Sequence, residues 1–279
     1  MLREDRMKYY ISFDYEGLAG VTNWQETYEN QRFNELATEQ MNSFLKGIFA
    51  GDPKAEVVIG DSHANGDNLI WEKLIGNTRL IKGYPRTYYM IEGLDESFDG
   101  LVLFGYHAPV GMQGNMDHTY SSSSFYSVEI NRKTVSEACI NAMTAVEFGI
   151  PLQFVYTDDV TAKWMHENVS DDIEILVSKK AISRYSAELL PNREILKKLF
   201  DAGKNLSSYF KYFYPKSEKY SCKIQCIDTN IAYACAMVPG VELLDARSLV
   251  FETYDMQTLY RYLMTLCMVA SSVKKLFRA

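Results

Sequence analysis

The sequence predicts an α/β protein in which helices flank a mostly parallel sheet in three layers, with a smaller α+β domain at the C-terminal end. Short apolar runs alternate with segments of helical periodicity, which is the pattern of repeated βαβ units. The runs at residues 100–105 and 151–156 hold almost no polar side chains, as expected for parallel strands buried on both faces. The pattern changes near Leu190, so we expect domains at residues 1–190 and 191–279.

The first domain is expected to begin with a strand at residues 8–13, where aromatic and β-branched side chains run up to a polar turn. The spacing of apolar residues predicts a helix over residues 34–49. Alternation around Asn131-Arg132 predicts a hairpin, and Ser136 is the expected N-cap of the helix after it. The other elements expected here are strands at 56–60, 79–82, 100–105 and 151–156, a short helix at 69–75, a hairpin over 124–134 and a helix over 137–148.

The second domain is expected to mix helices with short strands. Its predicted elements are a helix at 192–210, a strand at 221–227, a short helix at 230–237, strands at 241–244 and 247–252, and a final helix at 255–270. Such short strands in succession indicate an α+β unit.

Composition limits the classes of function. The chain has 279 residues, 47% of them hydrophobic, which is enough for a large core without disulfides. Its formal net charge of -7 argues against nucleic acid as a partner, because such binding needs a basic surface. The start, MLREDRMKYY, lacks the apolar core of a signal peptide, and no apolar stretch reaches the roughly 18 residues that span a bilayer. The five cysteines form no CxxC pair, which indicates reduced thiols and a cytoplasmic location, and we expect no membrane partner.

Acidic and histidine side chains follow three of the predicted strands at the point where each strand ends. Asp14 and Glu16 follow the first strand, His63 the second, and His107 the strand at residues 100–105. The carboxyl ends of parallel strands meet at one edge of a sheet, where ligands bind. Imidazole and carboxylate groups are the ligands of zinc and similar divalent ions. The sequence therefore predicts one metal site, assembled from separate segments.

Each of these residues also has an ordinary interpretation. Asp14 and Glu16 point to the same side of an extended chain, which is costly without a cation, but a solvated turn would explain the pair equally well. A single histidine at a strand end is more often an exposed or hydrogen-bonded core residue than a ligand. The coincidence of two such histidines with the acidic pair favours a shared site.

Two interpretations stay open for the remaining polar residues. His118 lies in a loop rich in glycine and serine, where it is either exposed or placed for proton transfer near neutral pH. Glu137 opens a helix, where the helix dipole stabilises a glutamate, so the local sequence gives it no function. Asp158 is interpreted as an N-cap rather than part of a site, and His166 as structural or exposed.

Several segments together resemble the DppA-type zinc D-aminopeptidase family. They are SFDYEGLAGV, GDSHANGDNL, MIEGLDESFDGLVLFGYHAPVG, MDHTY, SEACINA and the later TDD, in matching order along nearly the whole chain. The resemblance implies a two-domain fold, a homo-oligomer that is a decamer enclosing its active sites, and His118 as the catalytic histidine. It also implies two zinc ions per subunit, with the ligands Asp14, Glu16, His63, His107 and Glu137.

The resemblance implies an aminopeptidase that hydrolyses the N-terminal peptide bond of short peptides, including peptides of D-amino acids, or of amino-acid amides. Asp14 would bridge the ions, a metal-activated water would attack the carbonyl, and His118 would stabilise the intermediate or move a proton to the leaving amine. Two other functions fit the same residues: an amidase for non-peptide amides, and a metal- or peptide-binding protein without turnover. The chain departs from the family at Asp117, at Thr157 and over residues 21–32, which bears on substrate choice rather than on the ligands.

Overall fold

The computed structural model describes residues 6–27 and 31–276. The first five residues of the charged start, and residues 28–30 within the segment that departs from the family, lie outside the described residues. No helix in the described part of the chain combines the length and the apolar character needed to cross a membrane.

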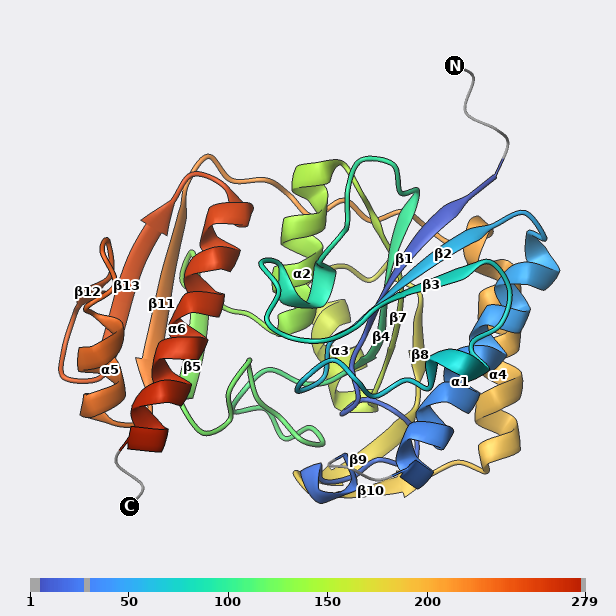
Figure 1. Ribbon diagram of the computed structural model, residues 1–279, viewed down its shortest axis with the longest axis horizontal. Helices are drawn as coiled ribbons and strands as arrows, with labels where there is room; N and C mark the ends of the chain where they lie inside the picture. The colour runs from blue at the N-terminus through green and yellow to red at the C-terminus, as the bar shows by residue number, and fades with distance from the viewer. Residues whose placement is uncertain (1–5, 28–30, 277–279) are drawn as a thin grey trace.

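A six-stranded parallel sheet forms the centre of the larger part of the molecule (Figure 1). Its strands in spatial order are β3 (Thr78–Ile81), β2 (Glu56–Asp61), β1 (Lys8–Phe13), β4 (Gly100–Tyr106), β7 (Leu152–Thr157) and β8 (Ile175–Val177). The chain runs outward from β1 to β3 and then returns to β4 on the other side of β1. The strand order therefore reverses between β1 and β4, and open α/β proteins bind ligands beside such a reversal, outside the carboxyl ends of the strands.

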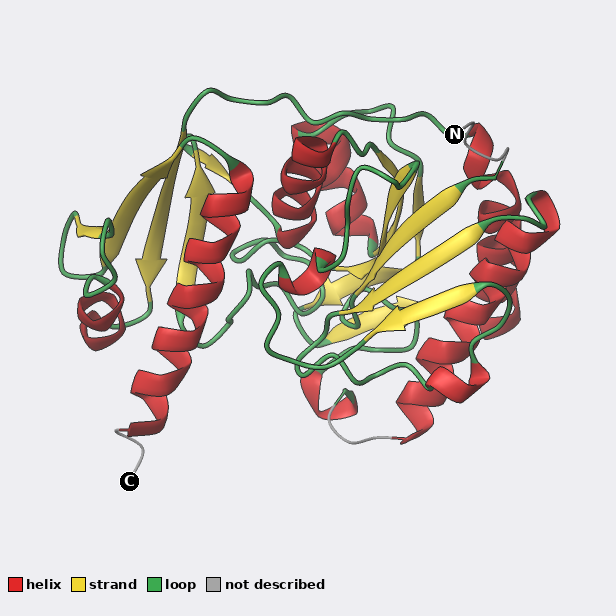
Figure 2. Cartoon of the chain, turned by 45° about the horizontal axis from the view of Figure 1, so that its top comes forward, coloured by secondary structure: helices red, strands yellow, loops and turns green. Residues whose placement is uncertain are grey.

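Helices cover both faces of this sheet, which confirms the predicted three layers (Figure 2). On one face lie α1 (Gln31–Gly51) and α4 (Asn192–Asn205), where Phe44 stacks on Phe154 with ring centroids 5.2 Å apart. The other face packs against α2 (Glu137–Ala145) and α3 (Asp159–Asn168). The helix predicted over residues 34–49 is α1. The apolar residues whose spacing predicts it are buried, namely Ala37, Met41, Phe44, Leu45 and Ile48.

A second, antiparallel sheet is packed by α5 (Thr229–Cys235) and α6 (Met256–Leu276). Its strands in spatial order are β12 (Glu242–Leu243), β13 (Ser248–Thr253), β11 (Tyr220–Cys226), β5 (Phe125–Ile130) and β6 (Lys133–Thr134). The predicted hairpin is confirmed as β5 and β6, and both residues of its turn have positive φ, 51° at Asn131 and 66° at Arg132. Positive φ at both central residues is typical of the tight turns that join antiparallel strands.

The two sheets do not follow the division of the chain at residue 190. The hairpin β5–β6 lies before that point but pairs with β11, with Ile130 opposite Cys222. Helix α4 lies after it but packs on α1. Whether residues 1–190 and 191–279 act as separate domains stays a prediction.

Some local predictions were wrong or incomplete, and one hairpin was missed. The helix predicted at residues 69–75 is a single 3-10 turn, Trp71–Lys73, because the backbone N–H groups of Asn68 and Leu69 bind the Asp61 carboxylate, which holds this stretch as a loop. Helix α4 ends at Asn205, before the predicted 210, and continues as one 3-10 turn, Leu206–Ser208. The hairpin of β9 (Lys179–Ser183) and β10 (Ser186–Leu189) was not predicted.

Candidate metal centre

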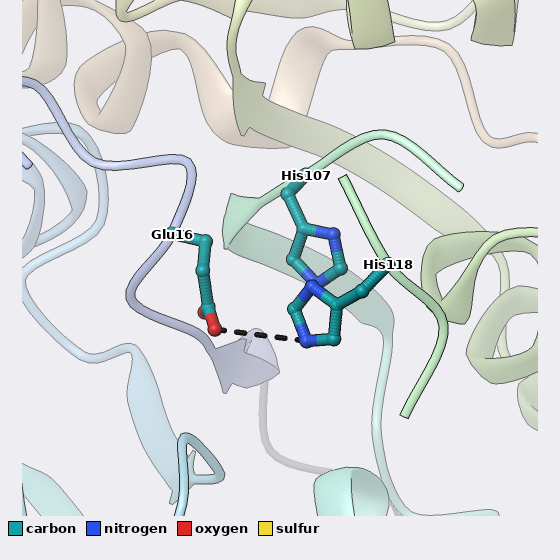
Figure 3. Close-up of side chains that lie close together, drawn as sticks. All are labelled: Glu16, His107 and His118. Atoms are coloured by element: carbon teal, nitrogen blue, oxygen red, sulfur yellow. Dashed lines mark ion pairs between the residues drawn. The ribbon is translucent and has the colours of Figure 1, made fainter. Parts of the chain in front are cut away.

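All six residues implied by the sequence come together at the carboxyl ends of β2, β1 and β4, beside the reversal in strand order. Asp14 and Glu16 follow β1, His63 follows β2 and His107 follows β4 directly. His118 reaches the same place from the loop after β4, and Glu137 from the first turn of α2. Their side chains are buried, and Figure 3 shows the rings of His107 and His118 lying side by side next to Glu16.

Asp14 lies between two histidines and presents one oxygen to each. Its Oδ1 is 3.6 Å from Nδ1 of His63, and its Oδ2 is 3.5 Å from Nε2 of His107. Two glutamates complete the group: Oε2 of Glu16 is 2.9 Å from Nδ1 of His63, and Oε1 of Glu137 is 3.5 Å from Nε2 of His107. The arrangement therefore has two adjacent halves that share Asp14.

The donor set fits divalent metal ions. Asp14 Oδ2 and His107 Nε2 are buried and find no hydrogen-bond partner among the described residues although they face each other, and such orphaned polar atoms are costly unless an ion satisfies them. Nitrogen and carboxylate oxygen are ligands that zinc prefers. Three sets of potential ligand atoms each lie within 4.8 Å of one another: Asp14, Glu16 and His63; Asp14, His107 and Glu137; Glu16, His107 and His118.

The ionisable groups of the metal-free site lie so close together that they shift one another's pKa values. Burial, and then the charge of Glu16, raise the pKa of Asp14 to about 8. Burial also acts to raise the pKa of Glu16, but the contact with His63 outweighs it and holds that pKa well below its usual range. Burial lowers the pKa of His107, yet the contact with Glu137 prevails and raises it to about 10. The raised pKa values mean that Asp14 and His107 hold protons in the metal-free site. A bound metal ion would displace these protons, because metal ligands must be deprotonated.

Backbone groups fix the orientation of several side chains in the site. The Nδ1 atoms of His107 and His118 lie 3.0 Å and 2.9 Å from the carbonyl oxygens of Ala108 and Met116. With Nδ1 as the donor to a carbonyl in each ring, Nε2 is the atom that faces the carboxylates, and it is the atom that would bind metal once deprotonated. Glu137 Oε1 accepts a hydrogen bond of 2.6 Å from the Tyr120 N–H, which holds the glutamate against the loop that carries His118.

Glycines let the ligand-bearing strand ends approach closely. Gly105 has a φ of +84°, and a Cβ there would overlap the carbonyl oxygen of Asp14. A Cβ at Gly17 would overlap the carbonyl oxygen of Tyr106, and the Gly17 N–H donates to the Gly105 carbonyl at 2.7 Å. Only glycine fits these two positions, so the Asp14 and His107 segments lie in direct backbone contact.

Other predicted residues lie where local reasoning placed them. Asp158 is the N-cap of α3 and accepts a hydrogen bond of 2.8 Å from the Thr161 N–H. Ser136 caps α2, so Glu137 is both a first-turn residue and part of the site. His166 has its Nε2 atom 3.1 Å from the carbonyl oxygen of Ile173 and belongs to none of the ligand groups among the described residues.

Residues that support the site were missed in the sequence. Trp24 and Thr27 contact Glu16 and His63, and the only signal was that residues 21–32 depart from the family. Lys179 is buried and donates to the carbonyl oxygens of Glu16, at 2.6 Å, and of Val21. A lysine is ordinarily exposed, so nothing in the sequence marked it.

Buried histidines and carboxylates at the strand ends of an open parallel sheet are typical of metal-dependent enzymes. The model of the D-aminopeptidase family matches residues 7–265. The chain therefore belongs to the D-aminopeptidase family, and it is a hydrolase, a metal-dependent aminopeptidase.

The chain is similar to D-aminopeptidase of Bacillus subtilis both in sequence and in structure. A D-aminopeptidase of Bacillus subtilis (strain 168) is 33% identical over 192 residues, which cover 66% of this chain and 68% of that protein. The solved structure of the Zn-dependent D-aminopeptidase DppA from Bacillus subtilis, described as a self-compartmentalizing protease, matches with a TM-score of 0.87 and 26% identity. That match covers 95% of this chain and 98% of the other.

Proposed function

We propose that the protein removes the N-terminal residue from short peptides, including peptides that begin with a D-amino acid, with the help of two zinc ions per subunit. The observation that carries the proposal is the position of Asp14, whose two oxygens face two different histidines. The proposed zinc ligands are Asp14, Glu16, His63, His107 and Glu137.

The proposed ligands divide into two sets that share Asp14. Glu16 and His63 complete one set, and His107 and Glu137 complete the other. A shared carboxylate is consistent with two ions held side by side, and the buried, unpartnered Asp14 Oδ2 supports this assignment. When bound, the ions supply a water molecule of lowered pKa as the nucleophile and an electrophile that polarises the carbonyl group.

We assign proton transfer to His118. Burial, and then the neighbouring His107, lower its pKa, so the ring is neutral at physiological pH. Its Nδ1 atom is engaged with the Met116 carbonyl, which leaves Nε2 as the acceptor, 3.7 Å from Glu16 Oε1 and 3.8 Å from Glu137 Oε1. From this position Nε2 takes up a proton as the nucleophile forms and returns it to the leaving amine.

A second role for His118 is favoured by one observation. One of its ring nitrogens also lies within 4.8 Å of ligand atoms of Glu16 and His107, as in a third possible metal group (Figure 3). In that role His118 would be a ligand rather than a proton carrier, and its replacement would remove metal rather than slow the reaction alone.

We further propose that the protein assembles into a closed homo-oligomer, a decamer, in which the active sites face an internal space. The description of the similar Bacillus subtilis enzyme as self-compartmentalizing supports the oligomer. Sedimentation of the purified protein would test the decamer. The expected cytoplasmic location stays a prediction, consistent with the five free cysteines.

Metal analysis combined with a substrate panel tests the proposed function. The panel holds short peptides and aminoacyl amides in L- and D-forms, each with a free or an acetylated N-terminus, and non-peptide amides. An aminopeptidase releases product only from substrates with a free amine, whereas an amidase also cleaves non-peptide amides. A binding protein without turnover would retain ligand and release no product, which would contradict the proposal.

A further inference from the structure

Residues 23–27 form one turn beside the metal centre, which we call the 23–27 turn. A capping box closes it: the Glu26 N–H donates to the Asn23 side chain at 3.2 Å, and the Asn23 N–H donates to Glu26 Oε2 at 3.3 Å. The same Glu26 oxygen accepts a bond of 2.7 Å from the Thr22 N–H. The turn is therefore well fixed, although it lies in the segment that departs from the family.

Trp24 in this turn fixes one oxygen of a proposed ligand. Its indole N–H donates to Glu16 Oε1 at 3.0 Å, and Oε2 of the same carboxylate points to His63. An indole N–H is a donor only and does not ionise, so this bond keeps one direction at any pH. The carboxylate is thereby held with Oε2 toward the first of the two ligand sets.

Thr27 in the same turn fixes the tautomer of the histidine in that set. Its hydroxyl donates to the Trp24 carbonyl at 2.8 Å, so its oxygen is left to accept from His63 Nε2, which lies 3.1 Å away. A proton on Nε2 leaves the lone pair on Nδ1, the atom that faces Asp14 and Glu16. His63 would thus bind metal through Nδ1, whereas His107 presents Nε2.

The outer side of the indole is covered as well. The Arg184 guanidinium lies 5.3 Å from the Trp24 ring and donates to the Asp117 carbonyl at 3.0 Å, and Tyr185 meets the same ring edge-on at 5.6 Å. The indole in turn meets the His118 ring edge-on at 5.4 Å. Trp24 is therefore clamped between the β9–β10 hairpin and the centre, with little freedom to move.

We propose that Trp24 and Thr27 are positioning residues of the metal centre, Trp24 by fixing the carboxylate of Glu16 and Thr27 by fixing the tautomer of His63. The inference rests on the proposed metal centre. Outer partners that orient metal ligands are typically worth about 10–100-fold in metal affinity.

The test compares variants that remove only the polar contact. Trp24→Phe keeps an aromatic ring without the N–H, and Thr27→Val keeps the shape without the hydroxyl. Thr27→Ser restores the hydroxyl. The matched controls are Trp71→Phe, at a tryptophan that is 63% exposed, and Thr87→Val, at an exposed threonine. Zinc affinity is measured in the full-length protein by competition with a chromophoric chelator, and thermal unfolding of the metal-free variants reports whether the fold is intact.

Trp24→Phe and Thr27→Val are expected to weaken zinc binding by about 10–100-fold, while Thr27→Ser and both controls bind as the unchanged protein does. In a Trp71→Phe background, zinc is expected to change the tryptophan fluorescence, and the further change Trp24→Phe to remove that response. If the unchanged protein binds zinc and the two variants bind it equally tightly, the inference is overturned and the metal centre stands. If the unchanged protein binds no zinc, the metal centre itself is refuted, and the inference with it.

Discussion

The imidazole rings of His107 and His118 stack in parallel, with centroids 3.9 Å apart and an angle of 6° between their planes. Two protonated rings at this distance would repel each other, so the pair does not carry two positive charges. Glu137 raises the pKa of His107 against the effect of burial, whereas burial and His107 lower the pKa of His118. The two stacked rings therefore differ in proton affinity, which is higher at His107 than at His118.

Replacing His118 should slow catalysis and leave the metal in place. In His118→Ala we expect an unchanged zinc content and a kcat lower by about 10²–10⁴-fold, the usual contribution of a positioned proton-transfer group. Elemental analysis and steady-state kinetics measure the two quantities. Loss of zinc from this variant would assign His118 to the ligands instead.

Replacing Asp14 or His107 should abolish both metal retention and hydrolysis. Each lies between the other proposed ligands, so its loss leaves buried groups without their counter-charge. His166→Ala is the control, since that histidine belongs to none of the ligand groups found in the described chain. Full activity in Asp14→Ala or His107→Ala would refute the dinuclear centre.

The metal-free protein should lose stability as the pH rises from about 6.5 to about 8. The folded-state pKa values of Asp14, about 8, and His107, about 10, both lie above the usual values, so the folded state holds more protons than the unfolded state in this window. Lys179, with its pKa lowered to about 8 by burial, opposes this trend only at higher pH. Thermal unfolding in a chelator, repeated with zinc, measures the effect. A rise in the unfolding temperature over this window would contradict the pKa assignments.

Adding one methyl group at Gly105 should damage the centre more than it damages the fold elsewhere. Gly105→Ala should lower the free energy of unfolding for two reasons. Alanine disfavours the positive φ at this position, and its Cβ would overlap the Asp14 carbonyl oxygen. Gly149 is the control for the first effect alone. Its φ is +76°, but no atom of the described chain beyond its own neighbours lies within 4 Å of the position that a Cβ would take. We expect Gly149→Ala to lose about 1–2 kcal/mol, and Gly105→Ala a further ~1–3 kcal/mol from overpacking. Zinc affinity should fall in Gly105→Ala alone, and equal losses in both variants would exclude the steric argument.

The position of the site could be predicted because the topology of the parallel sheet determines where its strand ends meet. Asp14, His63 and His107 follow apolar runs that read as parallel strands, and parallel strands end at one edge. Glu137 could not be found this way, since its local signal is that of a first-turn glutamate, and the structure shows that one residue satisfies both interpretations. Only the resemblance to the family pointed to it.

The surroundings of the site could not be predicted because they depend on contacts between distant segments. The Arg184 carbonyl accepts a bond of 2.8 Å from the Met116 N–H, and this contact joins an unpredicted hairpin to the loop that carries His118. Neither segment has a periodic pattern of apolar residues that would predict its structure or its contacts. The pairing of the β5–β6 hairpin with β11 is equally non-local, since alternation predicts a hairpin but not the sheet that it joins.

That pairing also bears on the order in which parts of the structure can form during synthesis. The loop that carries His118 runs from β4 in one sheet to β5 in the other, and β5, which pairs with β6 in its own hairpin, joins the rest of the antiparallel sheet only when β11 has been made. A nascent chain that ends before β11 could form β1, β2 and β4, but it would leave one edge of β5 without its partner strand, and long-range pairings of this kind are the slow steps of folding. The strand that anchors the far end of the His118 loop is therefore one of the later parts of the chain to be made.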